Sequence, residues 1–192
     1  MCGIYGFYST ENLINKNNKK DIFEKLWLRS ENRGKEACGI AFLDDGALAT
    51  KKFNTSSTEA FNTKDFKTKI NGYLSKEINS LLIGHSRLQT DGDRDNQDNN
   101  QPVISRGGHS VLFHNGIICN FEDLFNQNNL KKETELDSEY LLKRLDSLLV
   151  DKNFENSIKQ LFDEIEGEAT VAYTDKEYLL LATNCGNLYY KF

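Results

Sequence analysis

The stretch Met1-Cys2-Gly3-Ile4-Tyr5-Gly6-Phe7-Tyr8 opens the chain and sets its first element. Residues 2–8 alternate and are rich in aromatic side chains, which predicts a β-strand with Cys2 at its start. The same stretch lacks the basic n-region and the long apolar segment of a signal peptide. We therefore expect a protein that is made and kept in the cytoplasm.

Further along the chain, strands cluster near both ends and most helices lie between them. Residues 40–43 and 47–53 are predicted strands around Asp45-Gly46, a dipeptide typical of a β-hairpin. Other strands are predicted at 81–83, 110–113, 168–174 and 178–182, and helices at 19–30, 120–129, 137–149 and 154–165. Residues 54–80 are polar and predict one helix late in the stretch, and the strand at 110–113 is expected to stop at Asn115-Gly116. This order predicts a single α+β domain over residues 1–192, with antiparallel sheets covered by helices.

Composition excludes several classes of protein. Hydrophobic residues make up 38% and charged residues 28% of the 192-residue chain, which is typical of a folded protein and not of a disordered one. The formal net charge of −5 gives no basic face, so direct nucleic-acid binding by phosphate neutralisation is not expected. No apolar run reaches the roughly 18–20 residues of a membrane span, so no membrane partner is expected.

The metal-ligating residue types do not form a recognisable metal site. The cysteines are scattered without a CxxC pair, and the three histidines do not share ligand spacing with them, which argues against zinc. In a reducing compartment we expect free thiols at Cys2, Cys38, Cys119 and Cys185. The last three are expected to be small, buried apolar residues. Asp91, Asp93 and Asp95 match the first positions of a calcium loop. However, Asn96 replaces the required Gly and Pro102 the required Glu, so this acidic run is expected to be a solvated loop. No metal or cofactor is predicted.

Cys2 carries the strongest chemical signal. Removal of Met1 would leave the thiol beside a free α-amine, whose pKa is about 7.7–8.0 against about 10.4 for lysine. Such an amine is a usable general base near neutral pH and can activate the thiol directly or through a water. The structural alternative is a cysteine that only packs in a buried first strand.

Three other clusters have both a chemical and a structural interpretation. Arg87 follows a buried strand, where it could bind a carboxylate in a bidentate fork or be an ordinary loop arginine. Asn115 and the N–H of Gly116 could hold an oxyanion or form a plain Asn-Gly turn, and His114 before them is expected to pack or bond locally. Asp137 opens a predicted helix, where it could bind a substrate ammonium or act as a helix cap.

Six motifs follow one another along the chain: Cys2-Gly3-Ile4, Asn32-Arg33-Gly34, Gly39-Ile40-Ala41, Gly84-His85-Ser86-Arg87, His114-Asn115-Gly116 and Asp137-Ser138-Glu139. Their order and spacing closely resemble the class II glutamine amidotransferase domain, the N-terminal-nucleophile glutaminase domain of glucosamine-6-phosphate synthase, glutamine phosphoribosylpyrophosphate amidotransferase and asparagine synthetase. The resemblance implies a four-layer αββα sandwich and hydrolysis of the glutamine side-chain amide.

The resemblance also implies residue roles. Cys2 would be the nucleophile that forms a γ-glutamyl thioester, with its own α-amine as the base. Asn115 and Gly116 would hold the oxyanion. The substrate-binding residues would be Arg87 for the α-carboxylate and Asp137 for the α-ammonium, with Thr90 and Arg33 supporting them.

The family continues into a synthase domain about where this sequence ends, at Phe192. We therefore expect a free-standing glutaminase that passes ammonia to a separate synthase. Two alternatives stay open at this point. One is a Cys-type amidase for another amide, although a hydrolase for apolar acyl groups would not need both Arg87 and Asp137. The other is a catalytically silent binding or regulatory module, which retention of Met1 would favour.

Overall fold

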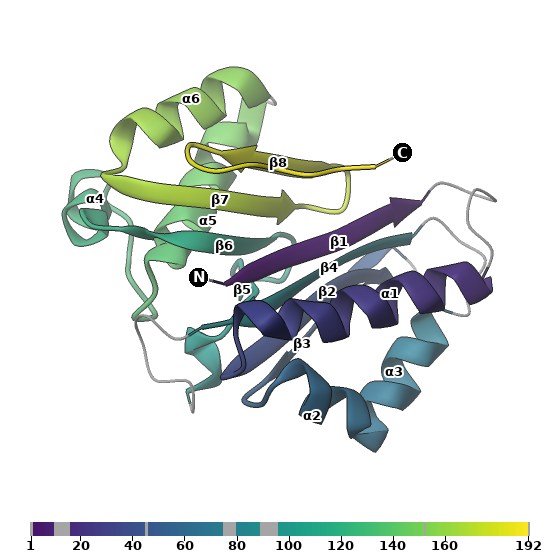
Figure 1. Ribbon diagram of the computed structural model, residues 1–192. Coiled ribbons are helices and arrows are strands. Elements are labelled where there is room, and N and C mark those ends of the chain that lie inside the picture. Colours follow the sequence, from purple (N-terminus) through teal and green to yellow (C-terminus); the bar gives the residue numbers. More distant parts are fainter. Residues whose placement is uncertain are drawn as a thin grey trace. The chain divides into compact units, whose positions relative to one another are not determined.

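The computed structural model describes residues 2–9, 16–44, 46–74, 80–88, 96–151 and 153–191. The chain divides into two compact units, an N-terminal unit of Met1–Pro102 and a C-terminal unit of Val103–Phe192. Each unit has its own four-stranded antiparallel sheet with helices packed on it (Figure 1).

The N-terminal unit is built on a sheet of strand order β1-β4-β2-β3. Its strands are β1 (Gly3–Ser9), β2 (Ala37–Asp44), β3 (Ala47–Phe53) and β4 (Ser80–Arg87). Its helices are α1 (Lys16–Ser30), α2 (Ser57–Asn62) and α3 (Lys64–Leu74), with short 3₁₀ turns at Glu31–Arg33 and Gln97–Asn99. Because β4 pairs with both β1 and β2, the residue that ends β4 lies between two neighbouring strands.

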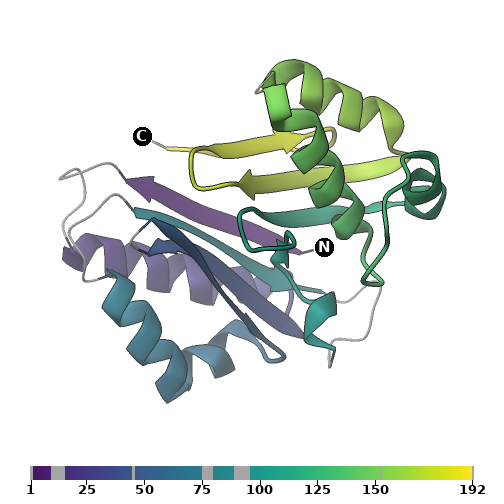
Figure 2. The same cartoon turned by 180° about the vertical axis from the view of Figure 1, so that it is seen from behind.

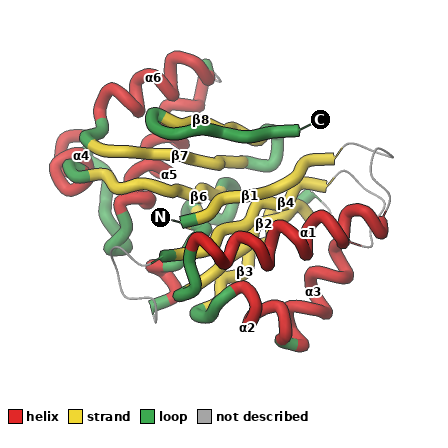
Figure 3. Tube along the Cα trace, in the orientation of Figure 1, coloured by secondary structure: helices red, strands yellow, loops and turns green. Residues whose placement is uncertain are grey.

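Aromatic packing joins the helices of this unit to its sheet. Phe23 and Trp27 are four residues apart on α1, so their side chains lie on one helix face. The Trp27 ring lies 4.6 Å from the ring of Phe66 on α3 and 6.1 Å from that of Phe53 on β3. The buried Trp27 Nε1 donates a hydrogen bond to the Ser57 carbonyl at 2.6 Å, so its polar group is satisfied inside the core. The three helices therefore cover one face of the sheet (Figure 3).

The C-terminal unit has a sheet of strand order β5-β6-β7-β8. Its strands are β5 (Val103–Ile104), β6 (Val111–Ile118), β7 (Gly167–Thr174) and β8 (Leu179–Thr183). Its helices are α4 (Phe121–Gln127), α5 (Asp137–Leu148) and α6 (Phe154–Glu164), with a 3₁₀ turn at Leu149–Asp151. Figure 2 shows α5 and α6 side by side on this sheet.

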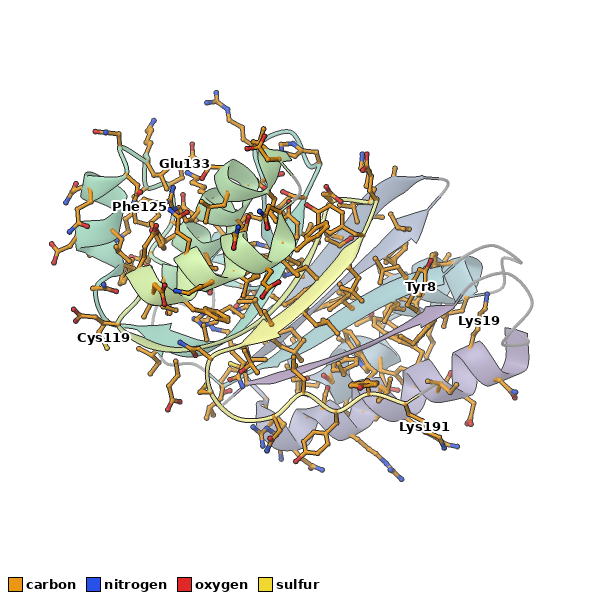
Figure 4. The ribbon with its side chains drawn as sticks, turned by 90° about the horizontal axis from the view of Figure 1, so that it is seen from above. Tyr8, Lys19, Cys119, Phe125, Glu133 and Lys191 are labelled. Atoms are coloured by element: carbon orange, nitrogen blue, oxygen red, sulfur yellow. The ribbon has the colours of Figure 1, made fainter. Side chains whose placement is uncertain are left out.

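Leucines of α5 and α6 form the core of the C-terminal unit. Leu141 and Leu145 are four residues apart on α5 and fully buried, as is Leu161 on α6. They pack against apolar side chains of β6 and β7 in one cluster. Phe125 of α4, labelled in Figure 4, meets Tyr140 edge-on at a ring distance of 5.6 Å. This packing fixes the start of α5 against β6.

Most predicted elements are present, with two corrections. The stretch 54–80 was expected to hold one helix but contains α2 and α3, and Ser56 and Glu59 form a capping box at the start of α2. The strand expected to stop at Asn115-Gly116 instead continues through both residues to Ile118, because β7 pairs with β6 along its whole length. The predicted β2–β3 hairpin is confirmed, although Asp45 itself lies outside the described residues.

Candidate active site

Cys2 and Arg87 lie at the same end of the N-terminal sheet. Gly3 pairs with Ser86 in the β1–β4 register, so Cys2 is level with Arg87 on the next strand. The Cys2 Sγ lies 3.5 Å from the carbonyl oxygen of Leu88. Burial raises the pKa of the Cys2 thiol above its ordinary value, and the Leu88 contact and the positive charge of Arg87 offset only part of this effect. A thiol in this state needs a base before it can act as a nucleophile.

Arg87 ends β4 with only 5% of its surface exposed. Its Nη1 donates a hydrogen bond to the Asn100 Oδ1 at 2.6 Å. Gly34 allows the preceding loop to press against the backbone of Arg87, since a Cβ added at Gly34 would lie 2.1 Å from the Arg87 carbonyl carbon. The Arg87 backbone is therefore packed against Gly34, and its guanidinium is bonded to the loop that carries Asn100.

Arg33 reaches the same neighbourhood from the 3₁₀ turn that precedes Gly34. A Cβ added at Gly3 would lie 3.0 Å from the Arg33 Cβ, so the Arg33 side chain lies over the start of β1. The N-terminal unit thus brings together Cys2, Arg33 and Arg87. Thr90, the remaining predicted substrate-binding residue of this unit, lies outside the described residues, as does the acidic run at 91–95.

In the C-terminal unit, Asn115 and Gly116 are consecutive residues of β6, paired with Thr170 and Ala169 of β7. Gly116 has a φ of +155°, and a Cβ there would lie 1.8 Å from the Glu168 carbonyl oxygen. Only glycine fits a backbone position that has both features. Asn115 and Gly116 are each half-buried.

Asp137 is the first residue of α5 and is bonded back to β6. Its Oδ2 accepts a hydrogen bond from the Ile118 N–H at 2.9 Å, two residues past Gly116. Burial alone would raise the pKa of this carboxyl, but hydrogen bonds from His114, Ile118 and Ser138 together with the nearby His114 ring hold the pKa below its ordinary value. Asp137 is thus a charged carboxylate at neutral pH, fixed beside the strand that carries Asn115 and Gly116.

His114 was expected to pack or bond locally, and its ring turns out to contact both α5 and β7, with its Nε2 3.4 Å from the Glu168 carbonyl oxygen. The ring is buried, with its Nδ1 3.0 Å from the Ser138 Oγ and 3.5 Å from the Asp137 Oδ1. The Ser138 hydroxyl also donates to the Asp137 Oδ1 at 3.2 Å. Sequence reasoning missed this contact with α5, because the partners are 24 residues apart along the chain and no local pattern links them.

The third residue of the Asp137-Ser138-Glu139 motif shapes the loop in front of α5. The Glu139 carboxylate is buried and accepts hydrogen bonds from the N–H groups of Glu133 and Thr134 and from the Thr134 hydroxyl. Lys143, one turn along α5, pairs with it at 2.6 Å. These partners offset the cost of burying the carboxylate, and the bonds to Glu133 and Thr134 tie the loop before α5 to the helix.

The remaining cysteines and the metal ligands can be surveyed only over the described residues. No group of three or more His, Cys, Asp or Glu side chains suited to a metal ion occurs among them. Cys38 is buried, and its burial raises the thiol pKa to about 12. Cys119 is exposed and Cys185 only half-buried, so the expected burial was wrong for both. Within the same residues, no helix is long and apolar enough to cross a membrane.

Residues 85–191 match the family model of the glutamine amidotransferase domain, a range that is more than half of the 192-residue chain. The chain belongs to this family. The matched range of the amidotransferase domain includes Arg87, Asn115, Gly116 and Asp137. The predicted class of enzyme, a class II glutamine amidotransferase, is confirmed by this match and by the relatives below.

The relatives of the amidotransferase domain are longer proteins. This chain is 28% identical over 183 residues to the amidophosphoribosyltransferase of Archaeoglobus fulgidus, and the match covers 89% of this chain and 36% of that protein. It is 32% identical over 148 residues to the glutamine–fructose-6-phosphate aminotransferase (isomerizing) of Staphylococcus epidermidis, covering 76% and 22%. It is 26% identical over 202 residues to the 7-cyano-7-deazaguanine synthase of Saccharolobus solfataricus, covering 98% and 40%. The chain thus spans between about a fifth and two fifths of the length of these relatives.

Solved structures share the fold of the amidotransferase domain. The glutamine phosphoribosylpyrophosphate amidotransferase from B. subtilis, complexed with ADP and GMP, matches with a TM-score of 0.65 and 22% identity over 95% of this chain and 37% of that one. A structure described as the allosteric regulatory enzyme of purine biosynthesis matches with a TM-score of 0.66 and 23% identity over 95% and 36%. These matches confirm the predicted fold class, an α+β fold of the N-terminal-nucleophile hydrolase type.

Proposed function

We propose that this chain hydrolyses the side-chain amide of glutamine, producing glutamate and ammonia through a thioester on Cys2. Family membership supports the reaction. The observation that carries the residue assignment is the pairing of β1 with β4, which sets Cys2 level with the buried Arg87. A nucleophile next to a fixed cation suits a substrate whose reacting amide and α-carboxylate belong to one small molecule.

In the proposed mechanism, Met1 is removed and the α-amine of Cys2 takes the thiol proton. The thiolate attacks the γ-carbonyl carbon of glutamine, and the protonated amine then gives its proton to the departing nitrogen, which leaves as ammonia. Water attacks the thioester, releases glutamate and returns the proton to the sulfur. Burial raises the pKa of the Cys2 thiol, so a built-in base is what makes the thiolate accessible near neutral pH.

The tetrahedral intermediates carry a negative oxygen that must be stabilised. We assign this role to the Asn115 amide and the Gly116 N–H, each worth about 2.7–4 kcal/mol in comparable sites. The left-handed φ of Gly116 supports the assignment, because backbone conformations open essentially only to glycine cluster at active sites.

Recognition of glutamine falls to two charges. Arg87 would bind the α-carboxylate in a bidentate fork. Asp137 would bind the α-ammonium, and its lowered pKa keeps it ionised for that purpose. Arg33 and Thr90 would support the substrate beside Cys2. Both charges together select glutamine over simple amides.

The ammonia acceptor is proposed to lie outside these 192 residues, on a separate synthase. The relatives named above carry at least as much additional length as the domain itself. A pulldown from the source cell should recover a synthase that makes its aminated product from glutamine in the presence of this chain. The proposal is wrong if no synthase binds and free ammonia serves equally well. We also propose a cytoplasmic location, where a free nucleophilic thiol stays reduced.

The reaction itself is tested on the purified chain by intact mass, glutamate release and labelling with 6-diazo-5-oxo-L-norleucine. We expect Met1 to be absent, Cys2 alone to be labelled, and Cys2→Ala to lose glutamate release by at least about 10⁴-fold. Cys119→Ala is the matched control, because Cys119 is an exposed thiol of the other unit. Equal rates for wild type and Cys2→Ala would remove Cys2 from the mechanism.

A further inference from the structure

A row of side-chain amides runs from the end of β3 to the end of β4 within the N-terminal unit. Arg87 Nη1 donates to Asn100 Oδ1 at 2.6 Å, and Asn100 Nδ2 donates to Asn54 Oδ1 at 3.1 Å. Asn100 is 1% exposed and Arg87 5%. None of the motifs in the sequence pointed to Asn100 or Asn54.

The chemistry of the partners fixes which way the Asn100 amide faces. A guanidinium only donates hydrogen bonds, so the Asn100 oxygen must point toward Arg87. Its NH₂ group then points the other way, toward the Asn54 oxygen. A flipped amide would set NH₂ against guanidinium and lose both bonds.

The loop that carries Asn100 is anchored on both sides. The Asn100 N–H donates to the Gln97 carbonyl at 3.1 Å, and Lys52 Nζ donates to the same carbonyl at 3.1 Å. Farther on, the Gln101 carbonyl oxygen packs so closely on β2 that a Cβ at Gly39 would lie 1.9 Å from it. Asn100 is therefore presented to Arg87 by a rigid support.

We propose that Asn100 is a positioning residue that aims the Arg87 guanidinium at the α-carboxylate of glutamine. The inference rests on the proposed function and adds to it the residue that sets carboxylate affinity. A neutral amide oxygen can fix the orientation of a guanidinium, whereas a carboxylate at the same place would pair with it and compete with the substrate.

The experiment compares two electrophiles that label Cys2. 6-Diazo-5-oxo-L-norleucine carries the α-carboxylate of glutamine, and iodoacetamide does not. Labelling rates are followed by mass spectrometry, and the concentration dependence separates the half-saturating concentration of the first reagent from its maximal rate. This readout does not depend on a synthase partner.

Asn100→Asp should raise the half-saturating concentration of 6-diazo-5-oxo-L-norleucine by about thirtyfold, because the new carboxylate occupies Arg87. Asn100→Ala should raise it by about tenfold, because the guanidinium loses one oriented partner. Maximal labelling rates and iodoacetamide rates should stay within about threefold. Asn62→Asp is the control for added charge, since Asn62 is an exposed asparagine of α2.

The outcomes separate the inference from the function beneath it. If 6-diazo-5-oxo-L-norleucine does not label Cys2 of the wild-type chain, the proposed function fails. If it does, and the Asn100 variants saturate like wild type, the inference is overturned. Equal slowing of both reagents also overturns it, since that indicates general damage. Should the Asn100 variants not fold, Asn54→Ala must raise the half-saturating concentration by about threefold, and no change there rejects the proposal.

Discussion

Arg87 at the end of β4 is buried and Asp137 at the start of α5 is partly buried. We assign both charges to substrate binding, and their surroundings differ in kind. Arg87 is held by an amide, Asn100, which is itself held by the amide of Asn54. Asp137 is held by a backbone N–H, by the Ser138 hydroxyl and by the titratable ring of His114. The contacts named for the cation come from neutral amides, and one of those named for the anion comes from an imidazole.

The difference indicates how each region keeps a charge inside the protein. A guanidinium stays protonated at any ordinary pH, so a neutral acceptor is enough to orient it. Burial alone would raise the pKa of the Asp137 carboxyl, and donors aimed at its oxygens hold that pKa down. Substitutions of the residues around Arg87 and of those around Asp137 should therefore differ in how they affect stability, substrate affinity and pH dependence.

The largest expected effect comes from two glycines at which neighbouring backbone segments approach closely, Gly116 against β7 and Gly34 against the end of β4. Gly116→Ala should destabilise the C-terminal unit by more than about 4 kcal/mol, because the new Cβ meets the Glu168 carbonyl and φ is left-handed. Gly34→Ala should cost less, about 2–3 kcal/mol, since it faces a clash with Arg87 without that backbone strain. Thermal unfolding followed by circular dichroism measures both.

Gly72→Ala is the control for these two variants. Gly72 lies inside α3, and a Cβ there meets no atom within 4 Å. It should raise stability by about 0.5–1 kcal/mol through helix propensity. If Gly34→Ala proves as harmless as Gly72→Ala, the close approach at Arg87 is not a constraint on the N-terminal unit.

A smaller effect is expected from the imidazole that supports Asp137. His114→Phe keeps a ring of similar size and removes both nitrogens, so it should raise the KM for glutamine by about thirtyfold, or about 2 kcal/mol, with kcat nearly unchanged. His114→Asn should recover much of the loss, because an asparagine NH₂ can donate from nearly the place of Nδ1. Steady-state kinetics on the three proteins tests this.

The pKa of Asp137 provides an independent measurement on the same variants. It should rise in His114→Phe, since the hydrogen bond and the charge of His114 both lower it. Carboxyl titration by NMR would show the rise. Identical behaviour of the Phe and Asn variants would mean that His114 acts through its volume and not through its nitrogen.

Local sequence signals were sufficient for much of the fold. Apolar spacing on α5 and α6 predicted both helices, and Asp137 at the first helical position fits the preference for acidic residues in a first turn. The alternation of residues 2–8 predicted β1, and its pairing with β4 brought Cys2 level with Arg87. The family motifs supplied the residue roles, which remain predictions.

The rest could not be predicted because it depends on contacts between distant segments. Asn115-Gly116 is a strong local turn signal, yet eight ladder pairs with β7 carry β6 straight through it. Asn100 meets Arg87 from a loop that is anchored on Lys52 of β3 and on Gly39 of β2. His114 meets Ser138 only once α5 lies on β6. Neither contact leaves a pattern in a short window of sequence.

The acid limit of stability should depend on Asp137. Its pKa in the folded protein lies below the ordinary value of 3.8, so the unfolded chain binds more protons as the pH falls below about 4. The stabilisation is complete above the unfolded pKa and is lost as the pH falls through the folded pKa. Asp137→Asn should therefore weaken the dependence of unfolding on pH in this acid range, as measured by denaturant titration at several pH values.

The smallest effect is expected at the alkaline end, from the lysine that anchors the Asn100 loop. Burial lowers the pKa of Lys52 from 10.5 to about 8. Between these pH values the unfolded chain binds more protons than the folded one, so stability should rise with pH by about 1 kcal/mol, the full linkage being reduced by water near the amine. Lys52→Met should abolish this rise, while Lys51→Met, which removes a surface ion pair with Asp65, should preserve it. If stability still rises with pH in Lys52→Met, Lys52 is not the group responsible for the rise. The loop that presents Asn100 to Arg87 would then be held by contacts that do not depend on pH.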